Sequence, residues 1–107
     1  MPLTEIGASD RLLEELRLWV EAETPTTDAA AVNRLLDRCA AELAAAGGAL
    51  TRLHGTEGYG DTLVCRTRGE GAPVVVAGHL DTVWDHGTLA TMPWRVAGDR
   101  AHGPGIY

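Results

Sequence analysis

The sequence predicts an α/β fold in which two amino-terminal helices pack on a partial mixed sheet. Three observations support this prediction. Two amphipathic segments occupy the first half of the chain, and two short strand-like runs come after them. A continuous apolar run lies at residues 74–77. Helices and strands that follow one another in this way are typical of layered proteins, in which helices cover a sheet.

The first helix is predicted over residues 10–22. Leu12, Leu16 and Trp19 recur there at the i, i+4, i+7 spacing of one helix face. Ser9 or Asp10 is expected to cap this helix, because such side chains accept hydrogen bonds from the free amides of the first turn.

The second helix is predicted over residues 28–46, with Thr27 or Asp28 as its cap. Gly47-Gly48 is expected to end it, because glycine readily adopts the left-handed conformation found just past many helices. The apolar residues of this segment fall on one side of the predicted helix: Val32, Leu35, Leu36, Cys39 and Leu43.

Short strands are predicted at residues 49–53 and 62–67, and a hairpin is predicted around Gly98-Asp99. The run V-V-V-A at 74–77 lies between Pro73 and Gly78. A short β-branched run between such residues predicts a strand that is buried on both faces.

The amino-acid composition limits the classes of function that this protein can have. The chain has 107 residues, which predicts one domain, and its formal net charge is −6 with no lysine. No basic cluster supports nucleic-acid binding, and no window approaches the ~20 apolar residues of a membrane span. Cys39 and Cys65 match no metal or redox spacing, so buried, reduced thiols are expected. Together with the lack of a recognisable signal peptide, this predicts a cytoplasmic protein.

His79 and Asp81 directly follow the apolar run. In an extended chain, side chains two residues apart project to the same side, and ligands of α/β proteins bind beyond the carboxyl ends of strands. His79 could therefore ligate a metal while Asp81 orients its ring, or it could act as a general base for a nucleophile. The second chemistry lacks a G-x-S-x-G or similar motif. A surface histidine bonded to a loop aspartate is the third interpretation of this short motif.

The remaining histidines before the last hairpin are expected to be at the surface. His54 lies in a glycine-rich loop without a spaced partner ligand. Asp85 and His86 follow the H-x-D motif in a loop, where they could add polar contacts near the site.

Several segments, taken in order, resemble the start of an M20 family zinc metallopeptidase, in particular its glutamate carboxypeptidase-like branch, a family that also includes acetylornithine deacetylases. The segment T-P-T at 24–26 occupies the place of a turn that this family has between its first two helices. The other matching segments are V-V-V-A-G-H-L-D-T-V at 74–83, G-T-L at 87–89, P-W-R-V at 93–96 and G-P-G at 103–105.

This resemblance implies a role for two residues. His79 matches a histidine that ligates one of two zinc ions, and Asp81 matches the catalytic-site aspartate that orients this histidine. Cobalt or manganese would accept the same ligands. The implied reaction is hydrolysis of a peptide or N-acyl amino acid amide bond in a small substrate. Full-length members of the family are often homodimers.

The resemblance further implies that residues 1–107 are the amino-terminal portion of a single catalytic domain, without a lid or dimerisation domain. The family's bridging aspartate is due about where the sequence reaches Tyr107. One imidazole and one carboxylate are fewer than the roughly three protein ligands of a catalytic zinc, so this chain alone is expected to be inactive. Two alternatives are a non-catalytic α/β interaction domain that has lost its metal site, and a small domain whose similarity is fortuitous.

Overall fold

The computed structural model describes residues 3–106 and confirms the α/β class, with two helices and two antiparallel two-stranded sheets. The chain divides into two compact units. One comprises the residues up to Glu23 together with those from Thr82 onward, and the other comprises Thr24–Asp81. The predicted mixed sheet is thus replaced by two separate hairpins, one in each unit.

Helix α2 (Ala29–Ala45) organises the unit formed by Thr24–Asp81. The Asp28 side chain caps it by accepting a 3.0 Å hydrogen bond from the Ala31 amide, which confirms one of the two predicted caps. Gly47 follows the helix with a φ of 91°, the left-handed conformation predicted for this position. Of the residues that the sequence places on the apolar face of α2, Val32, Leu35 and Leu36 are buried, whereas Cys39 and Leu43 are only half-buried. Ala31 is also buried.

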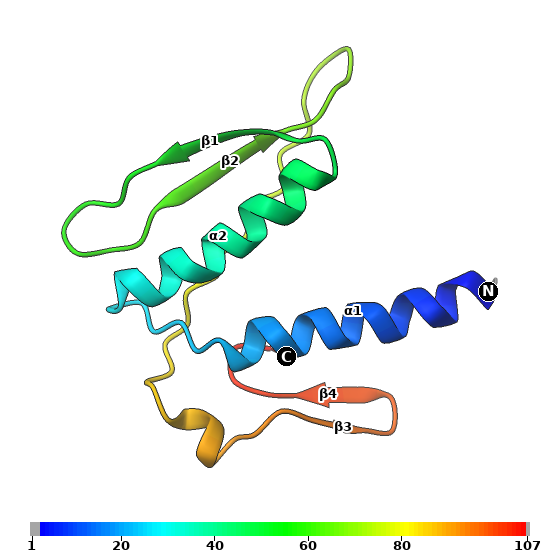
Figure 1. Ribbon diagram of the computed structural model, residues 1–107, viewed down its shortest axis with the longest axis vertical. Helices are drawn as coiled ribbons and strands as arrows, with labels where there is room; N and C mark the ends of the chain where they lie inside the picture. Colours follow the sequence, from blue (N-terminus) through cyan, green and yellow to red (C-terminus); the bar gives the residue numbers. More distant parts are fainter. Residues whose placement is uncertain (1–2, 107) are drawn as a thin grey trace. The chain divides into compact units, whose positions relative to one another are not determined.

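Strands β1 (Ala49–Leu53) and β2 (Thr62–Arg66) form the sheet of this unit, and both contact α2 (Figure 1). They are antiparallel, with Leu50 opposite Cys65. The loop between them approaches α2 closely at Gly60, where a Cβ atom would lie 2.7 Å from Val32 Cγ1. Any larger residue at this position would therefore force the loop or the Val32 side chain to move.

The prediction of a buried strand at residues 74–77 is wrong. Val74, Val75 and Val76 are 90%, 83% and 94% exposed. In Figure 1 the trace that follows β2 passes through these residues without an arrow, and no strand of the described chain pairs with them. An apolar β-branched run adopts a ladder only where a neighbouring strand pairs with its backbone groups.

The other unit contains helix α1 (Leu3–Glu21), the short 3-10 helix η1 (Thr88–Ala90) and the hairpin of β3 (Arg95–Ala97) and β4 (Arg100–His102). The turn of this hairpin is at Gly98, with a φ of 61°, as the sequence predicts. Val20 is buried and approaches Gly103 so closely that a Cβ atom there would lie 2.7 Å from its Cγ1.

Helix α1 differs from its prediction at two points. It begins at Leu3, so Ser9 and Asp10 lie inside the helix and neither caps it. Leu12, placed on the apolar face by its spacing, is 69% exposed. Spacing predicts which residues share a face, but packing decides which part of that face is covered.

Neither of the two described helices is long and apolar enough to span a bilayer.

Candidate functional site

His79 and Asp81 lie side by side, as their spacing predicts. The His79 Nδ1 atom is 2.8 Å from the carbonyl oxygen of Asp81 and 3.3 Å from its carboxylate oxygen Oδ1. Both acceptors face the same ring nitrogen. A proton on Nδ1 satisfies them, and this tautomer leaves the lone pair of the neutral ring on Nε2.

The His79 side chain is 80% exposed, so its ring is accessible to a metal ion or a ligand. Asp81 is less exposed, and the Thr26 hydroxyl donates a 2.7 Å hydrogen bond to its Oδ2. This hydrogen bond is the main cause that lowers the pKa of Asp81, and the nearby His79 ring adds to it, whereas partial burial opposes it. The carboxylate is therefore held in its charged form, which orients an imidazole.

The turn between the helices bonds to this segment at a second point. Thr24 is buried, and its hydroxyl donates a 2.6 Å hydrogen bond to the carbonyl oxygen of Leu80. The backbone between His79 and Asp81 is thus fixed by one threonine and the Asp81 carboxylate by another. The T-P-T turn at 24–26 therefore supports the H-x-D motif directly.

The sequence indicated the T-P-T turn through Pro25, which disfavours helical angles at Thr24, and through its place in a family pattern. Its hydrogen bonds span 55 and 56 residues, and sequence spacing holds no information on such distant pairs. The signal that was available is the pair of hydroxyl side chains flanking Pro25.

Metal ligation needs more groups than these two residues supply. Within residues 3–106, no group of three or more His, Cys, Asp and Glu side chains is arranged to hold a metal ion. A zinc ion at His79 would therefore need further ligands from outside the part of the chain described here.

His86 and Glu23 belong to the unit that contains α1, and His86 Nδ1 lies 3.8 Å from Glu23 Oε2. Glu23 chiefly bonds to backbone. Its carboxylate accepts hydrogen bonds of 3.1 Å from the amides of Gly87 and Leu89, at the start of η1. The amide of Gly87, followed by that of Leu89, lowers the pKa of Glu23. The hydrogen bonds of Glu23 to Gly87 and Leu89 thus fix the conformation of this loop. Asp85, in the same loop, is exposed, as predicted.

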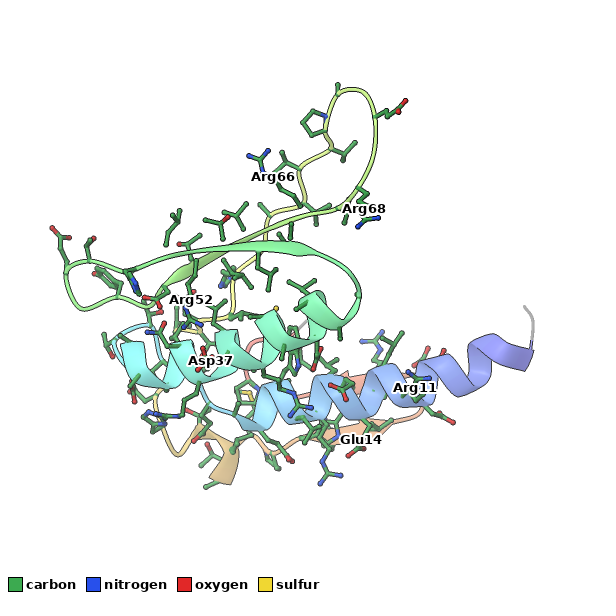
Figure 2. All side chains as sticks on the ribbon, turned by 45° about the horizontal axis from the view of Figure 1, so that its top comes forward. Arg11, Glu14, Asp37, Arg52, Arg66 and Arg68 are labelled. Atoms are coloured by element: carbon green, nitrogen blue, oxygen red, sulfur yellow. The ribbon has the colours of Figure 1, made fainter. Side chains whose placement is uncertain are left out.

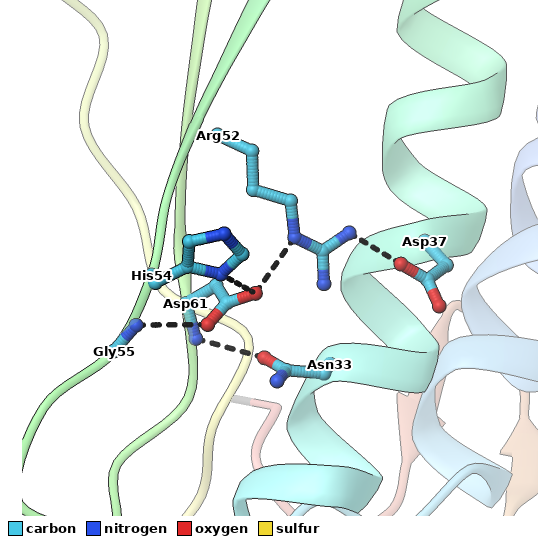
Figure 3. Close-up of polar contacts among 6 residues, drawn as sticks. All are labelled: Asn33, Asp37, Arg52, His54, Gly55 and Asp61. Atoms are coloured by element: carbon cyan, nitrogen blue, oxygen red, sulfur yellow. Dashed lines mark hydrogen bonds and ion pairs between the residues drawn. The ribbon is translucent and has the colours of Figure 1, made fainter.

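His54 is 92% exposed, as predicted for a surface residue, and belongs to a polar cluster on the β1–β2 loop (Figure 3). The Asp61 carboxylate, at the centre of the cluster, accepts hydrogen bonds of 2.8 Å from Arg52 Nε and from the Gly55 amide. Its own amide donates to Asn33 of α2. The cluster connects the loop to the helix.

Arg52 extends this cluster toward α2, where it also pairs with Asp37 (Figure 2). The hydrogen bonds from Gly55 and Arg52 lower the pKa of Asp61, and those to Asp61 and Asp37 raise the pKa of Arg52. These side chains satisfy one another, so we interpret the cluster as structural.

Both cysteines have free thiols, but they are half-buried rather than fully buried. Cys39 belongs to α2 and Cys65 to β2. Burial is the main cause that raises the pKa of Cys39. A raised pKa makes a thiol less reactive, in agreement with a packing role.

No family model matches the sequence. The chain is 36% identical over 97 residues to Carboxypeptidase G2 from Pseudomonas sp. (strain RS-16). This similarity covers 89% of the chain and 23% of that protein, so the chain spans less than a quarter of the length of this relative. The similarity supports a carboxypeptidase-like, hydrolase relationship for nearly the whole of the chain.

Proposed function

We propose that this chain is the amino-terminal part of the catalytic domain of a zinc-dependent, carboxypeptidase-like hydrolase. In this proposal His79 ligates zinc through Nε2 and Asp81 orients its ring. The proposed substrates are small peptides or N-acyl amino acids, whose amide bond is hydrolysed. The similarity to a carboxypeptidase supports the reaction class, and the contact between Asp81 and His79 supports the residue roles.

The observation that matters most is the 3.3 Å contact of His79 Nδ1 with the Asp81 carboxylate on an accessible ring. Histidines that ligate metals commonly donate their other ring N–H to a carboxylate or a backbone carbonyl. Asp81 offers both acceptors to Nδ1. The donor set thus fits a zinc ion at Nε2.

When bound, zinc would lower the pKa of a water molecule and polarise the scissile carbonyl group. The residues of this chain act before zinc binds, by preparing His79 as a ligand. Asp81 holds the proton on Nδ1 of His79, so that the neutral ring presents the lone pair of Nε2. The general base and the remaining ligands are not among the residues assigned here, so we expect the 107-residue chain to release no product from N-acyl glutamate substrates.

Zinc titration of the chain, followed by NMR of the histidine ring protons, tests this proposal. Because water must complete the coordination in this chain, zinc is expected to bind only weakly; it should still shift the ring signals of His79, and His79→Ala should abolish that shift. His54→Ala is the matched control, because His54 is also exposed and lies 3.7 Å from an aspartate. Equal zinc binding by the wild type and His79→Ala would contradict the assignment of His79.

A specific alternative is an α/β interaction domain without a metal site. The small number of candidate ligands within residues 3–106 favours it. In that case zinc would leave the His79 signals unchanged.

A further inference from the structure

The Asp81 carboxylate uses its two oxygens for two different partners. Oδ1 faces Nδ1 of His79 at 3.3 Å, and Oδ2 accepts the 2.7 Å hydrogen bond from the Thr26 hydroxyl. A carboxylate can turn about its last side-chain bond with little resistance. With Oδ2 bonded to Thr26, that rotation is blocked and Oδ1 stays directed at His79.

Thr26 is itself well placed for this purpose. It is half-buried and follows Pro25, whose ring fixes its own φ angle. On the other side of Pro25, Thr24 is buried and bonds to the Leu80 carbonyl. The turn therefore has little freedom, and the Thr26 hydroxyl has a defined position relative to Asp81.

We propose that Thr26 is a positioning residue: by fixing the Asp81 carboxylate, it acts together with the Asp81 carbonyl to set the ring orientation and the tautomer of His79. Nε2 of His79 is thereby kept unprotonated and ready to bind a metal ion. The tautomer part of this inference is independent of zinc, whereas its consequence for zinc rests on the proposed function. Thr26 acts only through Asp81 and need not contact metal or substrate.

The test uses the full 107-residue chain labelled with ¹⁵N and compares Thr26→Val with Thr26→Ser. The ring nitrogen shifts of His79 give the ratio of the two neutral tautomers, measured at a pH well above the usual histidine pKa of about 6.5. Thr26→Val keeps the shape and removes the hydroxyl, whereas Thr26→Ser keeps the hydroxyl. Thr27→Val, at the exposed neighbouring residue, is the control.

We expect the Nδ1-protonated tautomer to predominate in the wild type, Thr26→Ser and Thr27→Val. In Thr26→Val the tautomer ratio should fall by about threefold to tenfold, the equivalent of one lost hydrogen bond. An unchanged ratio in a folded Thr26→Val chain would overturn the inference. If Thr26→Val fails to fold, hydrogen exchange in the wild-type chain provides the test. The Thr26 hydroxyl proton should then exchange slowly with water, and rapid exchange would overturn the inference.

A zinc titration of the same samples separates this inference from the proposed function. Thr26→Val should weaken zinc binding at His79 about tenfold, at the lower end of the effects seen when a group behind a metal ligand is removed. If zinc does not affect His79 in the wild type but Thr26→Val changes the tautomer, the zinc proposal fails and the positioning role stands. If zinc binds the wild type and Thr26→Val equally and the tautomer is unchanged, the positioning role fails and the zinc proposal stands.

Discussion

The buried Thr24 hydroxyl donates a 2.6 Å hydrogen bond to the carbonyl oxygen of Leu80, 56 residues further along the chain. This bond joins the start of the Thr24–Asp81 unit to its end. It also fixes the backbone between His79 and Asp81, so the local stability of this unit and the geometry of the candidate site depend on the same contact.

Thr24→Val should destabilise the chain by about 1–3 kcal/mol, because it leaves the Leu80 carbonyl without its partner while preserving side-chain shape. Urea denaturation followed by circular dichroism measures this loss. Thr24→Ser keeps the hydroxyl and is expected to lose less. Equal stability of the valine and serine variants would show that the hydrogen bond contributes nothing.

Asp61 predicts a specific pH dependence of stability. Its hydrogen bonds with Gly55 and Arg52 lower its pKa in the folded chain. The unfolded chain therefore binds a proton at a higher pH than the folded chain does. This contribution is fully present above the usual aspartate pKa of about 3.9 and is lost as the pH falls through the lower, folded value.

The free energy of unfolding of the wild type should consequently decrease below about pH 4, and Asp61→Asn should show a shallower decrease. Glu70→Gln, at an exposed carboxylate, changes the charge equally and should follow the wild type. The remaining slope of Asp61→Asn is expected to come from Glu23 and Asp81, whose pKa values are also lowered. A slope unchanged by Asp61→Asn would contradict the prediction.

Gly55 and Gly69 form a matched pair for the effect of an added methyl group. At Gly55 a Cβ atom would overlap the carbonyl oxygen of Tyr59 and the backbone of Gly60, whereas at Gly69 no atom lies within 4 Å. Gly55→Ala should cost about 1–3 kcal/mol, because backbone must move. Gly69→Ala should stabilise by about 0.4–1 kcal/mol, because it restricts the unfolded chain. Thermal denaturation distinguishes the two, and a similar midpoint for both would show that the β1–β2 loop adapts freely.

The exposed valines at 74–76 predict self-association. Val75→Asp should reduce the association measured by sedimentation velocity and change the stability of the chain by less than about 0.5 kcal/mol. Thr67→Asp adds the same charge at another exposed residue of the same unit and should leave association largely unchanged. If both variants reduce association equally, net charge rather than the apolar segment is responsible.

Local patterns predicted the elements that are stabilised by local contacts. The Asp28 cap, the end of α2 before Gly47 and the turn at Gly98 all depend on neighbouring residues, and all three are confirmed. The run at 74–77 failed because a strand exists only with a partner, and its apolar character describes what could cover it rather than what does. A pattern within four residues cannot provide that information.

In the candidate site, too, the local contacts could be predicted from the sequence and the long-range contacts could not. The spacing of His79 and Asp81 predicted that the two side chains meet, and they do. Their hydrogen bonds to the T-P-T turn could not be predicted, because tertiary packing alone brings together Thr26 and Asp81, which are 55 positions apart. The Arg52–Asp61 bond also depends on the β1–β2 hairpin closing in one register.

The Glu23 carboxylate accepts hydrogen bonds from the main-chain amides of Gly87 and Leu89, and beyond these amides it lies 3.8 Å from Nδ1 of His86. Evolution can therefore exchange the Leu89 side chain without disturbing this recognition, provided that the new residue is not proline, which has no amide hydrogen to offer. Among homologues, the acidic residue at position 23 should consequently be retained while the amino-acid sequence of the loop varies. A search for sequence motifs would miss such a pattern, whereas a comparison of backbone structures would detect it.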